Sequence, residues 1–234
     1  MPEKLLIPSI EQRLSGLVEV SRRSQQMSGS KGKGAAKPAI TISREFGCEA
    51  YPVAERLKLR LEEKSGEQWA LVDKALLDEV AKDHDLARNV LHSLGDKPRW
   101  LDEMLSTLTP RWKNEKDYYK LLCEQIVSIA KGGNVIIVGM GGAIVTQALE
   151  NCCHFRIFAS EEFKIRSIAR RMKITPQDAA ILIEQRQTKR DKFIRNFLNE
   201  DARDLRFYHL IFNNDRNTAE QVAAVISAYV LEKK

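Results

Sequence analysis

The residues that could do chemistry in this chain begin with a short loop, Arg44 to Ala50, between a strand-like run and a helix-like run. The apolar, β-branched run 39–42 suits a buried strand, Gly47 permits a turn, and Pro52 suits the first turn of a helix. A helix N-terminus that follows a strand in this way presents backbone N–H groups and a positive partial charge. We therefore expect the loop to bind an anion such as phosphate.

The loop departs from the standard phosphate-binding pattern. That pattern is glycine, four residues, glycine, lysine and serine or threonine, in which the lysine reaches the β- and γ-phosphates and the hydroxyl binds Mg²⁺. The four specified places are held here by Arg44, Glu49, Ala50 and Tyr51. None of the four matches, so a phosphate bound here needs its positive charge from Arg44 or from another cation.

Positive side chains gather in two stretches further along the chain. They are Lys164, Arg166, Arg170, Arg171, Lys173, Arg186, Lys189, Arg190, Lys192 and Arg195. The planar donors of arginine suit phosphate oxygens, although basic helices are usually solvated faces with glutamate pairs. Arg171 points about 100° away from Arg170 on a helix, so we expect it at the surface. The near-helical spacing of residues 186, 190 and 195 allows one face to present all three arginines.

Alternating strand-like and helix-like segments must position these residues. We predict strands at 39–43, 69–72, 134–138, 154–158 and 209–213. We predict helices at 52–64, 74–82, 99–108, 118–130, 143–149, 161–173, 175–196 and 218–231. Because the strands are continuous apolar runs separated by helices, we expect an α/β fold with a parallel sheet covered on both faces.

The first 37 residues differ from the rest. Residues 9–20 have a modest helical periodicity, and residues 21–37 are rich in Ser, Gly, Lys and Arg. We therefore predict an N-terminal helix and a flexible basic linker over 1–37, followed by one main domain over 38–234. The Gly/Lys tract of the linker either contacts phosphate or is a solvated tail.

The composition narrows the class of protein. The chain is 43% hydrophobic and 30% charged, and no apolar run approaches the ~20 residues that span a bilayer. The beginning of the chain does not resemble a signal peptide, and the four cysteines have neither disulfide nor metal-ligand spacing. We expect a cytoplasmic protein with reduced thiols and no membrane partner. The net charge of +6 suits a phosphorylated partner, but no recognised nucleic-acid module occurs, so specific nucleic-acid binding is not expected.

Four stretches resemble the cytidylate-kinase-like proteins, a bacterial branch of the phosphate-loop nucleoside monophosphate kinases. The stretches are Ile40–Gly47, Val135–Gly141, Lys164–Arg171 and Tyr208–Asn213. The resemblance runs from about residue 38 to the C-terminus. It implies a three-layer phosphate-loop NTPase-like fold with a five-stranded parallel sheet and a helical lid at about 161–200. It also implies ATP-dependent phosphoryl transfer with Mg²⁺ to a nucleoside monophosphate, CMP or dCMP being the inherited acceptor.

The resemblance assigns roles residue by residue. It implies lid arginines with catalytic roles at Arg166, Arg170 and Arg190, and a phosphate-binding arginine at Arg195. It matches Asp73 to the acid that begins the monophosphate-binding region, and Gly139 and Gly141 to a glycine turn that faces the monophosphate. The loop residues expected to bind nucleotide phosphate are Ser43, Arg44, Gly47 and Cys48. No residue is assigned as a metal ligand.

Two of these loop assignments have an alternative. Ser43 and Arg44 either bind phosphate, or cap the loop and pair with a local carboxylate such as Glu45. Cys48 either has a lowered pKa at the helix N-terminus and is reactive, or is simply a small residue in place of a serine.

The chain also departs from the family at the presumed site. The family usually has Gly-Ser-Gly-Gly where this chain has residues 47–50, an arginine in place of Met140 and an acid in place of Gln187. The lost groups leave two hypotheses open: a working kinase, or a catalytically inactive nucleotide-binding or regulatory protein on the same fold. A basic nucleic-acid-associated protein is a third. The oligomeric state remains open.

Overall fold

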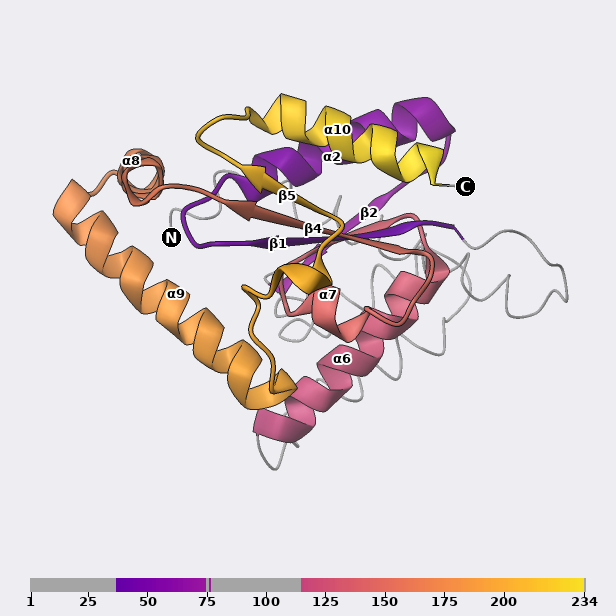
Figure 1. Cartoon of the computed structure of the whole chain (residues 1–234), viewed down its shortest axis with the longest axis horizontal. Coiled ribbons are helices and arrows are strands. Elements are labelled where there is room, and N and C mark those ends of the chain that lie inside the picture. Colours follow the sequence, from indigo (N-terminus) through magenta and orange to yellow (C-terminus); the bar gives the residue numbers. More distant parts are fainter. Residues whose placement is uncertain (1–36, 75, 77–114, 234) are drawn as a thin grey trace, which may run out of the picture.

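The computed structural model describes residues 37–74, 76 and 115–233 (Figure 1). Its five strands are β1 (Ala39–Arg44), β2 (Ala70–Asp73), β3 (Val135–Val138), β4 (Cys152–Phe158) and β5 (Leu210–Asn213). They form one parallel sheet in the order β2-β3-β1-β4-β5. The first strand is therefore central, and the predicted parallel α/β sheet of five strands is confirmed.

Helices cover both faces of this sheet. Helices α2 (Ala50–Ser65) and α10 (Ala219–Glu232) lie on one face, and α6 (Glu115–Gly132) and α7 (Gly142–Val145) lie on the other (Figure 1). All four residues of β3 are buried, because a strand enclosed on both faces exposes neither set of alternating side chains. In β1, Ile40 and Ile42 belong to the core cluster under α2 and α10, whereas Ala39 belongs to the cluster under α6.

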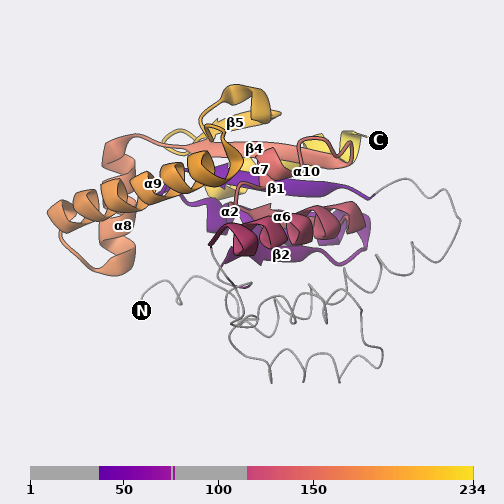
Figure 2. The ribbon, with the colours of Figure 1, turned by 90° about the horizontal axis from the view of Figure 1, so that it is seen from below.

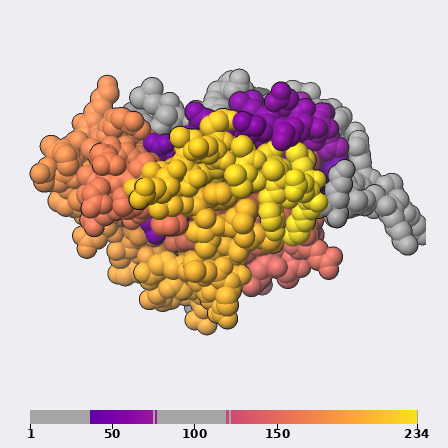
Figure 3. All heavy atoms as spheres, turned by 45° about the horizontal axis from the view of Figure 1, so that its top comes forward, coloured from indigo at the N-terminus to yellow at the C-terminus, as the bar shows by residue number. Residues whose placement is uncertain are grey.

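The outer surface of one helical layer is formed by α2 and α10, which lie side by side (Figure 3). Ion pairs from Arg56 and Arg60 to Glu220 join the two helices at the surface. No helix in residues 115–233 or 37–74 is long and apolar enough to cross a bilayer.

A helical hairpin extends beyond the carboxyl ends of the strands. It consists of α8 (Glu161–Met172), which lies outside the two helical layers, and α9 (Pro176–Leu198), whose C-terminal part packs against α6 (Figures 1 and 2). The Ser160 side chain caps α8 by accepting from the backbone N–H of Phe163, and Thr175 caps α9 in the same way from Asp178. A short 3₁₀ helix, η2 (Leu205–Phe207), then leads into β5. The hairpin falls within the segment 161–200 that was expected to form a lid.

The predicted and observed helices differ most at α7. We expected a helix over 143–149, but α7 ends at Val145. The hydroxyl of Thr146 donates to the Gly142 carbonyl oxygen over 2.8 Å, and Ser/Thr side chains that bond the local backbone in this way compete with helix continuation. The predicted helices at 9–20 and 99–108, and residues 21–36 of the linker, lie outside the described residues. Of the predicted helix at 74–82, only residues 74 and 76 are described.

Candidate phosphate-binding site

Residues 45–49 connect β1 to α2 at the carboxyl edge of the sheet. Gly47 has φ of +102°, and a Cβ atom there would lie 2.7 Å from the Cβ of Lys164 on α8. Only glycine combines this backbone conformation with so close an approach of α8. The backbone N–H of Glu49 donates to Asn214 Oδ1 over 2.8 Å, which ties the loop to the segment after β5.

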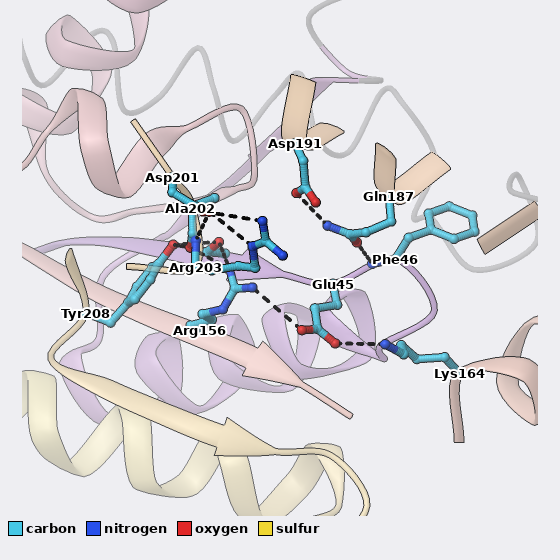
Figure 4. A network of polar contacts seen from close by, with 11 residues as sticks. Glu45, Phe46, Arg156, Lys164, Gln187, Asp191, Asp201, Ala202, Arg203 and Tyr208 are labelled. Carbon is cyan, nitrogen blue, oxygen red and sulfur yellow. Dashed lines mark hydrogen bonds and ion pairs between the residues drawn. The ribbon is translucent and has the colours of Figure 1, made fainter. Parts of the chain in front are cut away.

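Glu45 lies between two cations from different elements (Figure 4). Its Oε2 is 3.0 Å from Lys164 Nζ, and its Oε1 is 3.7 Å from Arg156 Nη2 on β4. The Arg156 side chain is only 6% exposed, and Nη1 donates to the Ala202 carbonyl oxygen over 2.8 Å and to Ser43 Oγ over 3.3 Å. The loop therefore brings a carboxylate to a guanidinium that the protein holds in a fixed position.

Tyr208 completes the fixing of this guanidinium. The Arg156 Cζ lies 5.6 Å from the centre of the Tyr208 ring. The Tyr208 hydroxyl lies 2.6 Å from the Ala202 carbonyl oxygen and 3.1 Å from Ser43 Oγ. Arg203, which pairs with Asp201 over 3.2 Å, lies beside the same group in Figure 4.

Phe46 attaches the loop to the helical hairpin. Its backbone N–H donates to Gln187 Oε1 over 2.8 Å, and the guanidinium of Arg190 lies 4.9 Å from the centre of its ring. The ring itself is buried in a small apolar cluster with Ile168, Ala179 and Ile183. The Nε2 of Gln187 in turn donates to Asp191 over 2.8 Å. Loop and hairpin are thus packed together through one aromatic side chain.

The glycine turn after β3 lies beside the loop. Gly139 has φ of +82°, and the guanidinium of Arg44 lies where a Cβ atom of residue 139 would project. Asp73 is buried at the end of β2 and pairs in register with Val138 of β3. Its Oδ1 accepts from the backbone N–H of Leu76 over 2.9 Å. Arg44 and Asp73 therefore flank the turn that was expected to face a monophosphate.

The hairpin brings two of the expected arginines to the loop. Arg170 Nη2 lies 3.0 Å from Glu49 Oε1, and Arg190 stacks on Phe46 as described above. The other two lie elsewhere. The charge of Arg166 acts on Asp215, whose pKa is held below its ordinary value mainly by hydrogen bonds from Ser160.

Arg195 lies near the far end of α9. Its Nη2 is 3.6 Å from Asp201 Oδ2, and its side chain is 64% exposed. Hydrogen bonds from the backbone and side chain of Arg203 hold the pKa of Asp201 below its ordinary value. Arg195 thus pairs with the segment after α9 and not with residues 45–49.

Cys48 is a buried residue of the loop. Burial raises the pKa of its thiol to about 12, and the nearby carboxylate of Glu45 adds to this effect. The alternative of a reactive thiolate with a lowered pKa is therefore wrong. A small, neutral residue in place of serine accounts for Cys48.

Several residues of the site were missed by sequence reasoning. They are Arg156, Asn214, Arg203 and, as a partner of Ser43 and Arg156, Tyr208. One signal for Arg156 existed, since a charged side chain inside the apolar strand 152–158 needs buried partners. Its partner Ser43 is the residue beside it in the β1–β4 register.

Comparisons with known proteins agree with this architecture. Residues 39–216 match the model of the cytidylate kinase-like family. A cytidylate kinase of Pyrococcus horikoshii is 29% identical over 107 residues, which cover 44% of this chain and 53% of that enzyme. The match therefore spans about half of that relative.

An uncharacterized protein from Eubacterium ventriosum superposes with a TM-score of 0.58 at 18% identity, over 84% of this chain and 99% of its own. A shikimate kinase from Bacteroides thetaiotaomicron reaches a TM-score of only 0.38 at 11% identity, over 83% of this chain and 98% of its own. The first of these likenesses shows a shared fold.

Proposed function

Because this chain belongs to the cytidylate kinase-like family, we propose that it transfers the γ-phosphoryl group of ATP to a nucleoside monophosphate. The acceptor is CMP or dCMP by family inheritance. The fold is of the phosphate-loop NTPase type, and the protein is nucleotide kinase-like. The observation that carries the proposal is the convergence of Arg170 and Arg190, from the two hairpin helices, on the loop at the start of α2.

Phosphoryl transfer makes demands that such an arrangement can meet. The reaction needs its phosphates held in line, its developing charge neutralised and water excluded, with little covalent chemistry from the protein. Arginines keep their charge at any working pH and bind phosphate oxygens through planar, paired donors. A hairpin that carries such arginines over a helix N-terminus suits the binding of a phosphate chain.

Cations near the loop replace some of the positive groups that the family usually has and this chain lacks. The usual arginine of the glycine turn is replaced by Met140, which is buried in the core under α6. The guanidinium of Arg44 lies over Gly139 of the same turn and supplies a positive charge there. Asp73, which matches the family's acid of the monophosphate-binding region, is buried at the end of β2, on the other side of β3 from β1.

The few carboxylates at this edge of the sheet suit a magnesium ion that is brought by the phosphates of ATP. Among the described residues, no group of three or more His, Cys, Asp or Glu side chains is arranged to hold a metal ion. Magnesium at nucleotide sites keeps water and phosphate oxygens as ligands and needs only one or two carboxylates from the protein. The carboxylates at this edge of the sheet include Asp73, Glu45 and Glu49. The ion supplies neutralisation of phosphate charge when it is bound.

The first test is calorimetric titration with ATP, ADP and CMP, with and without Mg²⁺, followed by coupled detection of ADP release. We expect turnover that falls at least about tenfold in Arg170→Ala, since the removed group acts on charge that develops during transfer. Arg56→Ala is the matched control, because Arg56 is an exposed arginine paired with Glu220 outside the site. Equal losses in both variants would contradict a role for the hairpin.

A second candidate function has its own observation. Glu45 and Glu49 bring two carboxylates to the loop, and each pairs with a cation that the reaction would need for phosphate. A nucleotide-binding or regulatory protein that has lost transfer would bind nucleotide without releasing ADP. The same titration and assay distinguish the two functions.

A further inference from the structure

The ion-paired group around Glu45 is a feature that phosphoryl transfer by itself does not explain. Lys164 comes from α8 and Arg156 from β4, and both face one carboxylate of the loop. The Glu45 side chain is 23% exposed, whereas that of Arg156 is 6% exposed. The carboxylate therefore has a route to solvent that the guanidinium does not.

We propose that Arg156 and Lys164 form the binding site for the polyphosphate chain of a nucleoside triphosphate, and that Glu45 occupies this site until the chain displaces it. This inference rests on the proposed function, because it names the cations that take over from the lysine missing at Ala50. Glu45 is then an internal substitute for a phosphate group. A carboxylate and a phosphate share the oxygen acceptors that a guanidinium and an ammonium group bind.

The position of Lys164 supports this assignment. A Cβ atom on Gly47 would lie 2.7 Å from Lys164 Cβ and 3.0 Å from its Cγ, so the stem of the lysine crosses the middle of the loop. Its ammonium group ends 3.0 Å from the Glu45 carboxylate. A lysine from the hairpin therefore reaches the loop in place of one that the loop itself would carry at position 50.

The fixation of Arg156 supports it independently. One nitrogen, Nη1, is held by the Ala202 carbonyl oxygen and by Ser43, while the other, Nη2, faces Glu45. The Tyr208 ring lies against the same guanidinium. Such a buried cation is oriented before any ligand arrives, which reduces the ordering cost of binding.

Glu45 must move when a phosphate chain binds. A carboxylate that remained between these cations would repel the incoming phosphates. Arg156 and Lys164 would then have to divide their interactions between the carboxylate and the phosphate chain. Displacement leaves Arg156 and Lys164 to the phosphate oxygens and sends the Glu45 side chain to solvent. Affinity for the chain is therefore lower than the cations alone would give, and it rises when the carboxylate is removed.

Inorganic tripolyphosphate is the probe that tests this site, with ATP titrated in parallel by calorimetry. In Glu45→Gln we expect both dissociation constants to fall about tenfold, because the competing charge is gone while the side-chain shape is kept. In Lys164→Met, which keeps the aliphatic stem against Gly47, binding weakens. In the Glu45→Gln background, Lys164→Met should weaken tripolyphosphate binding more, by about tenfold. The reason is that the lysine there does not have to break an ion pair before it binds phosphate.

Matched controls remove the same charges elsewhere. Glu220→Gln removes a carboxylate that pairs with Arg56 and Arg60, and Lys58→Met removes a lysine that pairs with Glu62 over 2.7 Å. Neither should change the affinity for tripolyphosphate. If Glu45→Gln does not fold, Glu45→Ala carries the same expectation. Unchanged or weaker binding without the carboxylate, or no effect of Lys164→Met in that background, overturns the proposal.

The two proposals fail in different ways. Tighter tripolyphosphate binding in Glu45→Gln without any ADP release would support the polyphosphate site and contradict the proposed kinase activity. Turnover in the unaltered protein, with an affinity for tripolyphosphate that Glu45→Gln does not change, would support the kinase activity and contradict the polyphosphate site. Tightening of tripolyphosphate but not of ATP would show a site for inorganic polyphosphate only, which contradicts the nucleotide assignment.

Discussion

At the scale of single residues, burial decides which groups near the sheet can carry charge. Cys48 and His154 are both buried. Burial raises the pKa of the Cys48 thiol and lowers the pKa of the His154 ring, and both shifts favour the neutral form. Arg156 is equally buried, and the charge that every arginine carries is matched there by a carboxylate, a carbonyl oxygen and a hydroxyl. Near neutral pH, Cys48 and His154 are therefore uncharged, whereas Arg156 is a permanent cation.

Cys48 should resist thiol reagents in the folded protein. Its pKa of about 12 arises first from burial and then from Glu45, so only a trace of thiolate exists near neutral pH. We expect maleimide labelling of Cys48, followed by peptide mass spectrometry, to be at least about tenfold slower in the folded protein than in urea. Equal rates in both states would contradict the burial of this thiol.

His154 should make stability depend on pH in acid. Its Nδ1 lies 2.9 Å from Thr41 Oγ1, and burial lowers the pKa of the ring to about 4, with the charges of His209 and Lys233 adding to the shift. As the pH falls, the unfolded chain takes up this proton near its ordinary pKa, before the folded protein does. Stability is therefore complete above about pH 6.5 and is lost between about pH 6.5 and 4, by roughly 3 kcal/mol.

The measurement is the free energy of unfolding by urea at pH 7 and at pH 4.5. The control is His154→Asn, which keeps a polar side chain beside Thr41 but does not titrate in this range. The difference between the two proteins removes the contribution of carboxylates that titrate in the same window. An equal pH dependence in both proteins would show that His154 is not the cause.

At the scale of elements, the main apolar contact between the loop and the hairpin of α8 and α9 is made by Phe46. Phe46 fills the apolar cluster between the two helices, and its backbone N–H bonds to Gln187. In Phe46→Ala we expect faster hydrogen exchange across 176–190, and a stability loss of about 2–4 kcal/mol if hairpin and sheet unfold together. Exchange in β1 and β3 should change much less.

The matched control for Phe46 is an exposed apolar residue of the same hairpin. Ile181 on α9 is 55% exposed, so Ile181→Ala should leave exchange in 176–190 nearly as it is. Equal exchange in Phe46→Ala and the unaltered protein would contradict the view that the loop anchors the hairpin.

Gly47 should tolerate a side chain less well than Gly66. Both have positive φ, +102° and +66°, but a Cβ atom at Gly66 would meet no other atom within 4 Å, whereas at Gly47 it would meet Lys164. We expect Gly66→Ala to cost about 1 kcal/mol and Gly47→Ala clearly more, about 2–4 kcal/mol. Urea unfolding of the two variants measures this difference, and equal losses would mean that the approach of α8 is not tight.

The sequence predicted those elements that leave a local pattern of apolar residues, and it did not predict features that depend on individual hydrogen bonds or on strand register. The strands were predictable because a β-strand enclosed on both faces is apolar throughout, as Val135–Val138 is. The early end of α7 was not, because it follows from a bond between Thr146 and the backbone. The pairing of Arg156 with Ser43 and Glu45 depends on the β1–β4 register, which local patterns along a single chain do not reveal.

At the scale of the whole molecule, the net charge of +6 is a poor guide to the partner. Several cations of the hairpin already face carboxylates: Lys164 faces Glu45 and Arg170 faces Glu49 at the loop, and Arg195 faces Asp201 at the far end of α9. Such pairs can exchange one anion for another, but they give only a modest net field toward a long polyanion. Binding strength should therefore depend on where a phosphate chain fits and not on total charge.

This argument leads to different salt dependences for ATP and for RNA. RNA affinity falls with salt in proportion to the number of phosphates that the protein neutralises, whereas ATP carries only a short chain. For a single-stranded RNA of about 20 nucleotides, we expect weak binding that falls steeply with salt and survives Arg170→Ala. For ATP we expect a shallower dependence and a loss of about tenfold in Arg170→Ala, measured by titration at several salt concentrations. RNA binding that is tighter than ATP binding at physiological salt, and that is lost when Lys31 and Lys33 are changed to Ala, would instead favour a nucleic-acid-associated protein.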